Sequence, residues 1–440
     1  MTATLRTLAL ATAALVMAAL PARAEIEIQE VETPGGITAW LVEEPSIPFV
    51  ALELRFKGGA SLDAPGKRGA TNLMTGLLEE GTGEMDARGF ARALEGLAAS
   101  FDYDAFDDTI SVSARFLTDT TDEAMALLRG SIVEPAFNQV AIDRVKAQVL
   151  SGLASDASDP DRIVSRTFDR LAFGDHPYAT SFKGTRESVL ALSREDIVAA
   201  HQAAFARDRV YVSAVGDISA EALSALLDTL LADLPETGPA LPGAAPFLLE
   251  GGLTVEPFDT PQSVVLFGHE GLERDHPDFL AAYVINEVFG GSGLTSRLMT
   301  EVREKRGLTY GVYSYLVPKD HAALVMGSVA SANTRVAETI AVIRDQWARL
   351  GQEGLTAEEL TAAKTYLTGA YPLRFDGNGP IANILVGMQM DGLGPDYVTE
   401  RNALVEALTL DEVNRVAAEL YDPEALHFVV VGQPEGLETQ

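Results

Sequence analysis

The side chains that most often bind metals or attack substrates are sparse in this sequence. It has no cysteine, which excludes a thiol nucleophile and a thiolate metal site. Two histidines hold one metal from a single helix when they lie three or four residues apart, and no pair here has that spacing. The six histidines are His176, His201, His269, His276, His321 and His427. The sequence therefore predicts no local zinc site, and it leaves open a site assembled from distant histidines.

A glycine-rich segment, Gly290-Gly291-Ser292-Gly293, has the small residues of a phosphate-binding loop. It lacks the accompanying lysine of a P-loop and the strand and helix context of a dinucleotide-binding motif. We therefore interpret this segment as a turn before a helix.

The composition limits the classes of partner. The formal net charge of -31 repels nucleic acids and anionic membranes, and it leaves basic peptides as an attracted class. The alternative is an acidic surface that only confers solubility. With 440 residues and 47% hydrophobic content, the chain is long enough for two or more domains with full cores.

Residues 1–24 have the pattern of a secretory signal peptide. Arg6 precedes an apolar stretch from Leu8 to Leu20, and Ala22-Arg23-Ala24 fits the cleavage pattern of small residues. This stretch is too short to span a bilayer, and no later segment has the roughly eighteen uninterrupted apolar residues of a spanning helix. We expect an exported, periplasmic protein without membrane insertion.

The sequence contains an internal repeat. A helix pattern beginning at Ser193 and an apolar run over 210–216 recur from Thr409, 216 residues later. Asp196 and Glu412 follow the two hydroxyl residues at the capping-box spacing. The apolar runs are continuous, as expected of strands buried on both faces. We infer that one domain has been duplicated.

The duplication predicts two homologous α+β domains, each an antiparallel-rich sheet covered by helices. We assign residues 25–233 to the first domain and residues 251–440 to the second. Residues 234–250 between them are rich in proline and glycine, which predicts an interdomain linker.

Hydrophobic periodicity locates individual elements. Residues 49–56 alternate and predict a half-buried strand, while residues 67–79 have apolar side chains at helical spacing. In the second domain we expect a helix over 292–306 and a strand over 308–317. Further elements are expected over 109–117, 122–132, 138–154, 264–267, 276–289 and 322–332, with helices starting at Asp86, Thr334 and Thr356.

The order and the residues of four segments resemble those of the pitrilysin, or insulinase-like, zinc metallopeptidase family. This family includes the mitochondrial processing peptidase. The segments are Gly59 to Gly69, Glu80-Gly81-Thr82, His176-Pro177-Tyr178 with Gly184-Thr185, and Ser296 to Tyr310. The resemblance extends over essentially the whole mature chain and is most specific in the last segment. It implies the duplicated, processing-peptidase-like fold.

The zinc-binding motif of active family members is absent. In those proteins the inverted motif His-x-x-Glu-His precedes Gly-Thr on a helix, where two imidazoles hold zinc and the glutamate activates water. Aligned through the flanking glycines, the corresponding positions are Asn72, Thr75 and Gly76, which are poor substitutes for ligands and a general base. Ser151 and Gly152 stand where the family has its third, glutamate ligand.

A second catalytic element of the family persists. Arg303 and Tyr310 match a pair in the C-terminal half that reaches across the chamber to the zinc-bearing half. The resemblance implies that the arginine fixes the peptide backbone and that the tyrosine donates to the oxyanion, roles that suit a guanidinium and a phenol. The alternative is that Arg303 is a solvated cation near a helix end and Tyr310 an ordinary strand residue.

The missing zinc ligands and the retained pair Arg303 and Tyr310 together lead to a functional hypothesis. We expect a non-catalytic, zinc-less subunit of a heterodimeric zinc metalloendopeptidase, which supplies Arg303 and Tyr310 in trans for peptide binding. No cofactor is expected in this chain, and zinc is expected in a homologous partner subunit. The first alternative is a non-proteolytic peptide-binding or scaffold protein of the cell envelope. The second is an independent hydrolase that uses another metal.

Overall fold

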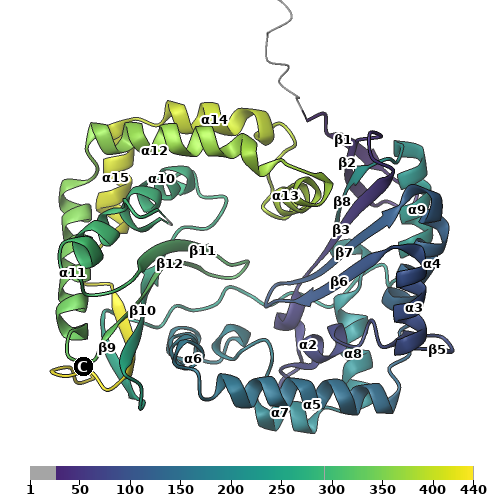
Figure 1. The fold of residues 1–440 in the computed structure, drawn as a ribbon, viewed down its shortest axis with the longest axis horizontal. Helices are drawn as coiled ribbons and strands as arrows, with labels where there is room; N and C mark the ends of the chain where they lie inside the picture. The colour runs from purple at the N-terminus through teal and green to yellow at the C-terminus, as the bar shows by residue number, and fades with distance from the viewer. Residues whose placement is uncertain (1–25, 292, 440) are drawn as a thin grey trace, which may run out of the picture.

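The described residues form two large sheets, one in each half of the molecule, with helices packed around them (Figure 1). A small two-stranded sheet, β4 (Gly81–Thr82) with β5 (Met85–Asp86), lies in the first half. The computed structural model describes residues 26–291 and 293–439. The signal peptide expected at residues 1–24 lies outside the described residues. Among the helices that the structure does describe, none combines the length and the apolar character needed to cross a membrane.

The first sheet has six strands in the order β1-β2-β8-β3-β7-β6. Its strands are β1 (Gln29–Glu32), β2 (Thr38–Glu43), β3 (Phe49–Lys57), β6 (Ser100–Ala105), β7 (Thr109–Leu117) and β8 (Val210–Gly216). β2 and β8 pair in parallel, and every other pair in this sheet is antiparallel.

The second sheet has five strands in the order β11-β12-β10-β13-β9. Its strands are β9 (Gly252–Pro257), β10 (Gln262–Glu270), β11 (Val312–Pro318), β12 (Ala323–Ala332) and β13 (His427–Gly432). β9 and β13 are parallel, and the other pairs are antiparallel. Order and directions therefore repeat those of β2-β8-β3-β7-β6, which confirms the duplicated α+β fold.

The helices follow the same repeated order. The first half contains α2 (Ala70–Thr75), α3 (Ala87–Leu97), α4 (Thr121–Val133), α5 (Gln139–Asp156), α6 (Pro160–Phe173), α7 (Arg186–Ala191), α8 (Arg194–Ala204) and α9 (Ala220–Leu231). The second half contains α10 (Phe279–Gly290), α11 (Val336–Glu353), α12 (Ala357–Ala370), α13 (Asn378–Met390), α14 (Tyr397–Ala407) and α15 (Leu410–Leu420). Residues 232–251, between the halves, form neither helix nor strand.

Local caps begin the equivalent helices α8 and α15. The Ser193 hydroxyl accepts from the N–H of Asp196 at 3.3 Å, and the Asp196 carboxylate accepts from the N–H of Ser193 at 2.8 Å. The corresponding distances between Thr409 and Glu412 are 3.2 and 2.8 Å. Both expected capping boxes are confirmed, and each satisfies amides that the helix itself leaves unpaired.

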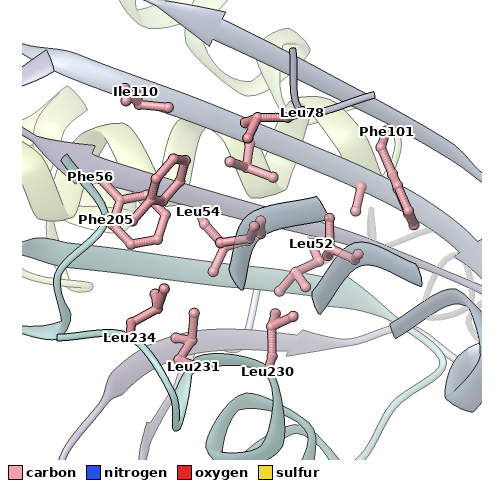
Figure 2. Packing of buried hydrophobic residues seen from close by; sticks show 14 of the residues in the cluster. Leu52, Leu54, Phe56, Leu78, Phe101, Ile110, Phe205, Leu230, Leu231 and Leu234 are labelled. Atoms are coloured by element: carbon pink, nitrogen blue, oxygen red, sulfur yellow. The ribbon is translucent and has the colours of Figure 1, made fainter. Parts of the chain in front are cut away.

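The core of the first half lies on one face of its sheet. Alternate residues of β3 and β7 point into it, namely Val50, Leu52, Leu54, Phe56, Ile110, Val112, Ala114 and Phe116. Figure 2 shows Leu52, Leu54 and Phe56 in one cluster with Leu230 and Phe205. The rings of Phe56 and Phe205 meet edge to face at 4.8 Å between centroids. The alternation predicted in both strands is confirmed for this face.

The opposite face of the first sheet is covered by α13, a helix of the second half (Figure 1). The buried residues of this contact are Ala382, Leu385 and Met388 of α13 with Trp40, Ala51 and Val215 of the sheet. Ala51 and Glu53 are only 1% and 5% exposed. The prediction of a half-buried strand over 49–56 is therefore wrong, because a helix far downstream buries the second face.

Polar groups also join α13 to this face. Glu53 accepts a hydrogen bond from the Ser113 hydroxyl at 2.6 Å and pairs with Arg55 at 2.8 Å. Arg55 in turn donates to the side-chain oxygen of Asn383 on α13 at 2.6 Å. The buried carboxylate is thus paired and hydrogen-bonded, as burial of a charge requires.

Conversely, α6 of the first half packs on a face of the second sheet. The residues of this contact are Val164, Phe168, Ala172 and Phe173 with Leu266 of β10, Leu324 of β12, and Val429 and Val431 of β13. Each half therefore provides one helix that covers a sheet face of the other half. Figure 1 shows α6 and α13 between the two sheets.

The tips of the hairpins β6–β7 and β11–β12 meet between the halves. The Lys319 ammonium lies 2.8 Å from the Asp107 carboxylate. The Tyr178 hydroxyl donates to Asp108 at 2.6 Å and accepts from the N–H of His321 at 3.1 Å. A polar network therefore connects the halves alongside the two helix contacts.

Asp169 of α6 belongs to this network. Burial raises the pKa of Asp169 to about 7, Lys319 opposes the rise, and Asp107 adds to it. The folded state therefore holds this proton more tightly than the unfolded chain, whose aspartate pKa is about 3.9. As the pH rises from about 4 to about 7, the unfolded state binds fewer protons and the stability of the fold decreases.

We expect Asp169→Asn to raise the free energy of unfolding by up to about 4 kcal/mol at pH 8 and to have little effect near pH 4. The neutral amide removes the cost of ionising a buried carboxyl, and each pKa unit corresponds to about 1.4 kcal/mol. Urea unfolding of both proteins at pH 4, 6 and 8 measures the difference. Asp376→Asn, at an exposed position, is the matched control. Parallel pH profiles of Asp169→Asn and the native protein would contradict the expectation.

Candidate functional site

The helix α2 carries the degenerate metal positions, and Asp63 fixes its start. The Asp63 carboxylate accepts from the N–H groups of Gly69 and Thr71 at 2.7 and 2.8 Å, and from the Thr71 hydroxyl at 2.7 Å. Burial raises the pKa of Asp63, and these hydrogen bonds act in the opposite direction. The beginning of α2 is therefore held without any contribution from a metal.

The length of α2 differs from the prediction. The helix spans Ala70–Thr75, so the helix expected over 67–79 is wrong at both ends. Gly69, with φ of +97°, precedes it, and Gly76 follows it. Beyond Gly76 the backbone hydrogen bonds reach back three residues instead of four, which tightens the chain into turns.

None of the three degenerate positions offers a group that holds zinc. Asn72 presents an amide, which is a poor zinc ligand. Thr75 is 3% exposed, and its hydroxyl donates to the Thr71 carbonyl at 2.9 Å. At Gly76 a Cβ atom would lie 3.2 Å from Cγ1 of Val145, a buried residue of α5. The hydroxyl is bound within the helix, and a side chain at position 76 would start in tight contact with Val145.

The helix α5 supplies no carboxylate in place of the third ligand. Ser151 and Gly152 are exposed there, and Glu80 pairs with Arg144 of the same helix. Within residues 26–291 and 293–439, no three His, Cys, Asp or Glu side chains are arranged to hold a metal. The residues present do not fit the family's zinc ion, and we assign no chemical step of this chain to one.

The histidines include one pair that the sequence could not connect. His176 and His321 come from different halves, and their ring centroids lie 6.0 Å apart beside Tyr178. Burial lowers the pKa of His176, which favours its neutral form. The pair belongs to the network between the halves, and no third ligand joins it within the described residues.

The segment before β11 contains the second set of predicted residues. The α-helix expected over 292–306 is wrong, because the chain forms a π-helix at Met299–Glu304. The N–H of Lys305 bonds to the carbonyl of Thr300, five residues earlier, at 3.0 Å. Apolar spacing in so short a segment does not distinguish this pattern from an α-helix. Single π-turns occur often at functional sites.

Gly307 ends the π-helix in the left-handed conformation. Its φ is +60°, and its N–H bonds to the Arg303 carbonyl at 2.8 Å. The N–H of Leu308 bonds to the Val302 carbonyl at 3.0 Å. These two bonds satisfy carbonyls that the helix end leaves unpaired.

Arg303 and Tyr310 are both exposed, and neither side chain forms a hydrogen bond or ion pair with another described residue. Tyr310 is 86% exposed. The neighbouring cations Lys305 and Arg306 pair with Glu301 at 2.6 and 2.7 Å. In this part of the described chain, Arg303 therefore keeps its guanidinium donors available while its neighbours do not.

Thr309 is a positioning residue that sequence reasoning missed. Tyr310 lies in a turn before β11 and not in a strand, so the strand expected over 308–317 begins too early. The Thr309 hydroxyl lies 2.7 Å from the Ala330 carbonyl of β12 and 2.9 Å from the Gly311 carbonyl. No local pattern pointed to Thr309, because Ala330 lies on a different strand.

The two sets of predicted site residues lie in different halves. α2 packs beneath the first sheet, whereas the segment with Arg303 and Tyr310 leads into β11 of the second sheet (Figure 1). No hydrogen bond or ion pair among the described residues joins one set to the other.

Known protein families match both halves of the chain. Residues 39–186 match the family described as Insulinase (Peptidase family M16), and residues 191–367 match the Peptidase M16 inactive domain. The non-peptidase homolog YmxG of Helicobacter pylori is 27% identical over 386 residues, which cover 84% of this chain and 86% of that protein. The uncharacterized zinc protease YmxG of Bacillus subtilis is 23% identical over 396 residues, which cover 88% of this chain and 94% of that protein.

Solved structures share the fold over nearly the whole chain. A peptidase M16 inactive domain from Pseudomonas fluorescens has a TM-score of 0.87 at 28% identity, covering 94% of this chain and 99% of that one. A protease from Helicobacter pylori has a TM-score of 0.84 at 16% identity, covering 92% of this chain and 100% of that one. The second likeness is one of fold alone.

Restoring the motif on α2 should not restore a zinc site. We expect the triple variant Asn72→His, Thr75→Glu, Gly76→His to retain no stoichiometric zinc after dialysis, because α5 provides no third ligand. The new side chain beside Val145 should also cost about 1–3 kcal/mol of stability by overpacking. Metal analysis and urea unfolding measure both effects, with Asn72→His alone as the control. One zinc per chain at unchanged stability would contradict this expectation.

Proposed function

Because the chain belongs to the insulinase (peptidase M16) family and lacks its metal-binding side chains, we propose that it is the zinc-less subunit of a heterodimeric metallopeptidase. By itself the chain is a non-catalytic member of that family. In the proposed complex a homologous subunit holds the zinc, and this chain supplies Arg303 and Tyr310 in trans. The complex would cleave peptides in the periplasm, to which residues 1–24 would direct this chain.

The asymmetry between the two sets of site residues carries this proposal. The α2 positions present an amide, a bound hydroxyl and a bare backbone, whereas Arg303 and Tyr310 keep free functional groups on an ordered backbone. The neighbouring cations Lys305 and Arg306 instead share Glu301. The difference supports a ligand outside the chain for Arg303.

The two side chains suit complementary tasks on a peptide. A guanidinium is a permanently charged fork that binds carbonyl oxygens, so Arg303 would hold the peptide backbone. A phenol is a neutral donor at physiological pH, so Tyr310 would donate to the oxygen on which negative charge develops. The net charge of -31 would favour the encounter with basic peptides.

We expect Tyr310→Phe to lower the kcat of the reconstituted complex by about a hundredfold, because one donor to the oxyanion is lost. KM should change little, since the aromatic ring remains. Tyr366→Phe removes another exposed phenol, at 55% exposure, and serves as the matched control. Steady-state peptide cleavage by this chain mixed with a zinc-bearing homologous subunit measures both variants.

Two outcomes separate catalysis from assembly. An unchanged kcat for Tyr310→Phe would remove the catalytic role while leaving the pairing intact. Failure of the two subunits to co-elute in size-exclusion chromatography would instead remove the heterodimer.

The second candidate function is a non-proteolytic scaffold or peptide-binding protein of the cell envelope. The relative in Helicobacter pylori, named a non-peptidase homolog, favours this candidate. In this case Arg303 and Tyr310 would have no catalytic task. A pull-down from the periplasmic fraction that recovers no zinc peptidase would favour the scaffold over the heterodimer.

A further inference from the structure

A pocket of about 590 Å³ lies outside the site described above. It is bounded by α5, by α6 and by the segment 179–187, and Glu256 of β9 adds a side chain from the second half. Its volume falls within the range of about 300–1,000 Å³ that is typical of small-molecule sites. Neither the degenerate metal positions nor the pair Arg303 and Tyr310 contributes to its wall.

Three arginines line this pocket. Arg166 and Arg170 lie one turn apart on α6, so they share a face of that helix, and Arg186 begins α7. Within the described chain none of the three lies within ion-pair distance of a carboxylate, although Glu187 and Glu256 also line the pocket. Three unpaired guanidiniums in one pocket are unexpected in a chain with a net charge of -31. Their planar donors are suited to phosphate and carboxylate oxygens.

Thr167 adds a hydroxyl to the same part of the pocket wall. It lies on α6 between the two arginines and lines the pocket, yet the residue is only 6% exposed. Its hydroxyl forms no hydrogen bond with another described residue. Because Thr167 lines the pocket, its hydroxyl can donate a hydrogen bond to an oxygen of a bound ligand.

Part of the pocket wall is apolar. Its lining residues are Leu150, Leu153 and Ala154 of α5, Ala157 directly after that helix, and Ile163 in the first turn of α6. A bare inorganic anion would leave this wall in contact with water. A ligand that covers it must have an aliphatic part next to its charged group.

We propose that this pocket binds a small amphipathic anion, with its phosphate or carboxylate head on Arg166, Arg170 and Arg186 and its aliphatic body on α5. Thr167 donates a hydrogen bond to the head. Glu187 and Glu256 disfavour an extended polyanion by repulsion, so the ligand has a single charged head. The assignment does not depend on the proposed peptidase complex.

Isothermal titration calorimetry of the full chain tests this assignment. Octyl phosphate, below its micelle concentration, should bind with a saturable 1:1 isotherm, whereas inorganic phosphate should bind at least about tenfold more weakly and octanol should not bind. Octanoate replaces the phosphate head by a carboxylate, and the tighter of the two ligands identifies the preferred head group. Absence of saturable octyl phosphate binding, or equal affinity for inorganic phosphate, would overturn the proposal.

Variants locate the ligand within the pocket. The double variant Arg166→Gln, Arg170→Gln should weaken octyl phosphate binding by about tenfold to a hundredfold, because charge-assisted hydrogen bonds are lost. Leu153→Gln should weaken octyl phosphate without affecting inorganic phosphate. Arg349→Gln, on the exposed face of α11, is the matched control. Unchanged affinity in a double variant with native melting temperature would show that the ligand binds elsewhere.

Discussion

The rest of the structure depends on two contacts: α6 of the first half packs on the second sheet, and α13 of the second half packs on the first sheet. A sheet has two faces, and the helices of each half cover only one of them. α13 buries Ala51 and Val215 of the first sheet, while α6 packs on β10 and β13 of the second. Fully burying one large aliphatic side chain contributes about 1.5–3 kcal/mol, so these contacts outweigh any single polar contact between the halves. Without the opposite half, each sheet would have one face uncovered.

This arrangement explains how the fold persists without the zinc site of its family. Asp63 holds the start of α2 through backbone amides, Val145 lies against Gly76, and Arg144 pairs with Glu80. None of these contacts involves a metal ligand. The scaffold therefore rests on burial and local hydrogen bonds, and the chemistry of a family site is separable from the fold that carries it.

The segment from 299 to 311 is organised differently from α2. A π-helix, the left-handed Gly307 and the bonds of Thr309 fix its backbone, yet Arg303 and Tyr310 make no side-chain contact within the described residues. Met299, Val302 and Leu308 pack into the core of the second half and hold this backbone, whereas no internal contact explains the exposed Arg303 and Tyr310. The combination is the arrangement expected of residues that act on a ligand, and it distinguishes this segment from the solvated surface around it.

Contacts between residues that lie close together in the sequence could be predicted from the sequence alone. The capping boxes at Ser193 and Thr409 join residues three apart, and the absence of zinc ligands on α2 holds in any fold, because no packing supplies a missing imidazole. Only the tertiary structure decided the burial of Glu53 under α13, the bond from Thr309 to Ala330, and the pocket in which Arg186 joins two arginines of α6. The reason is physical: hydrophobic burial is non-directional, so an apolar pattern shows that a face will be covered without showing which distant segment covers it.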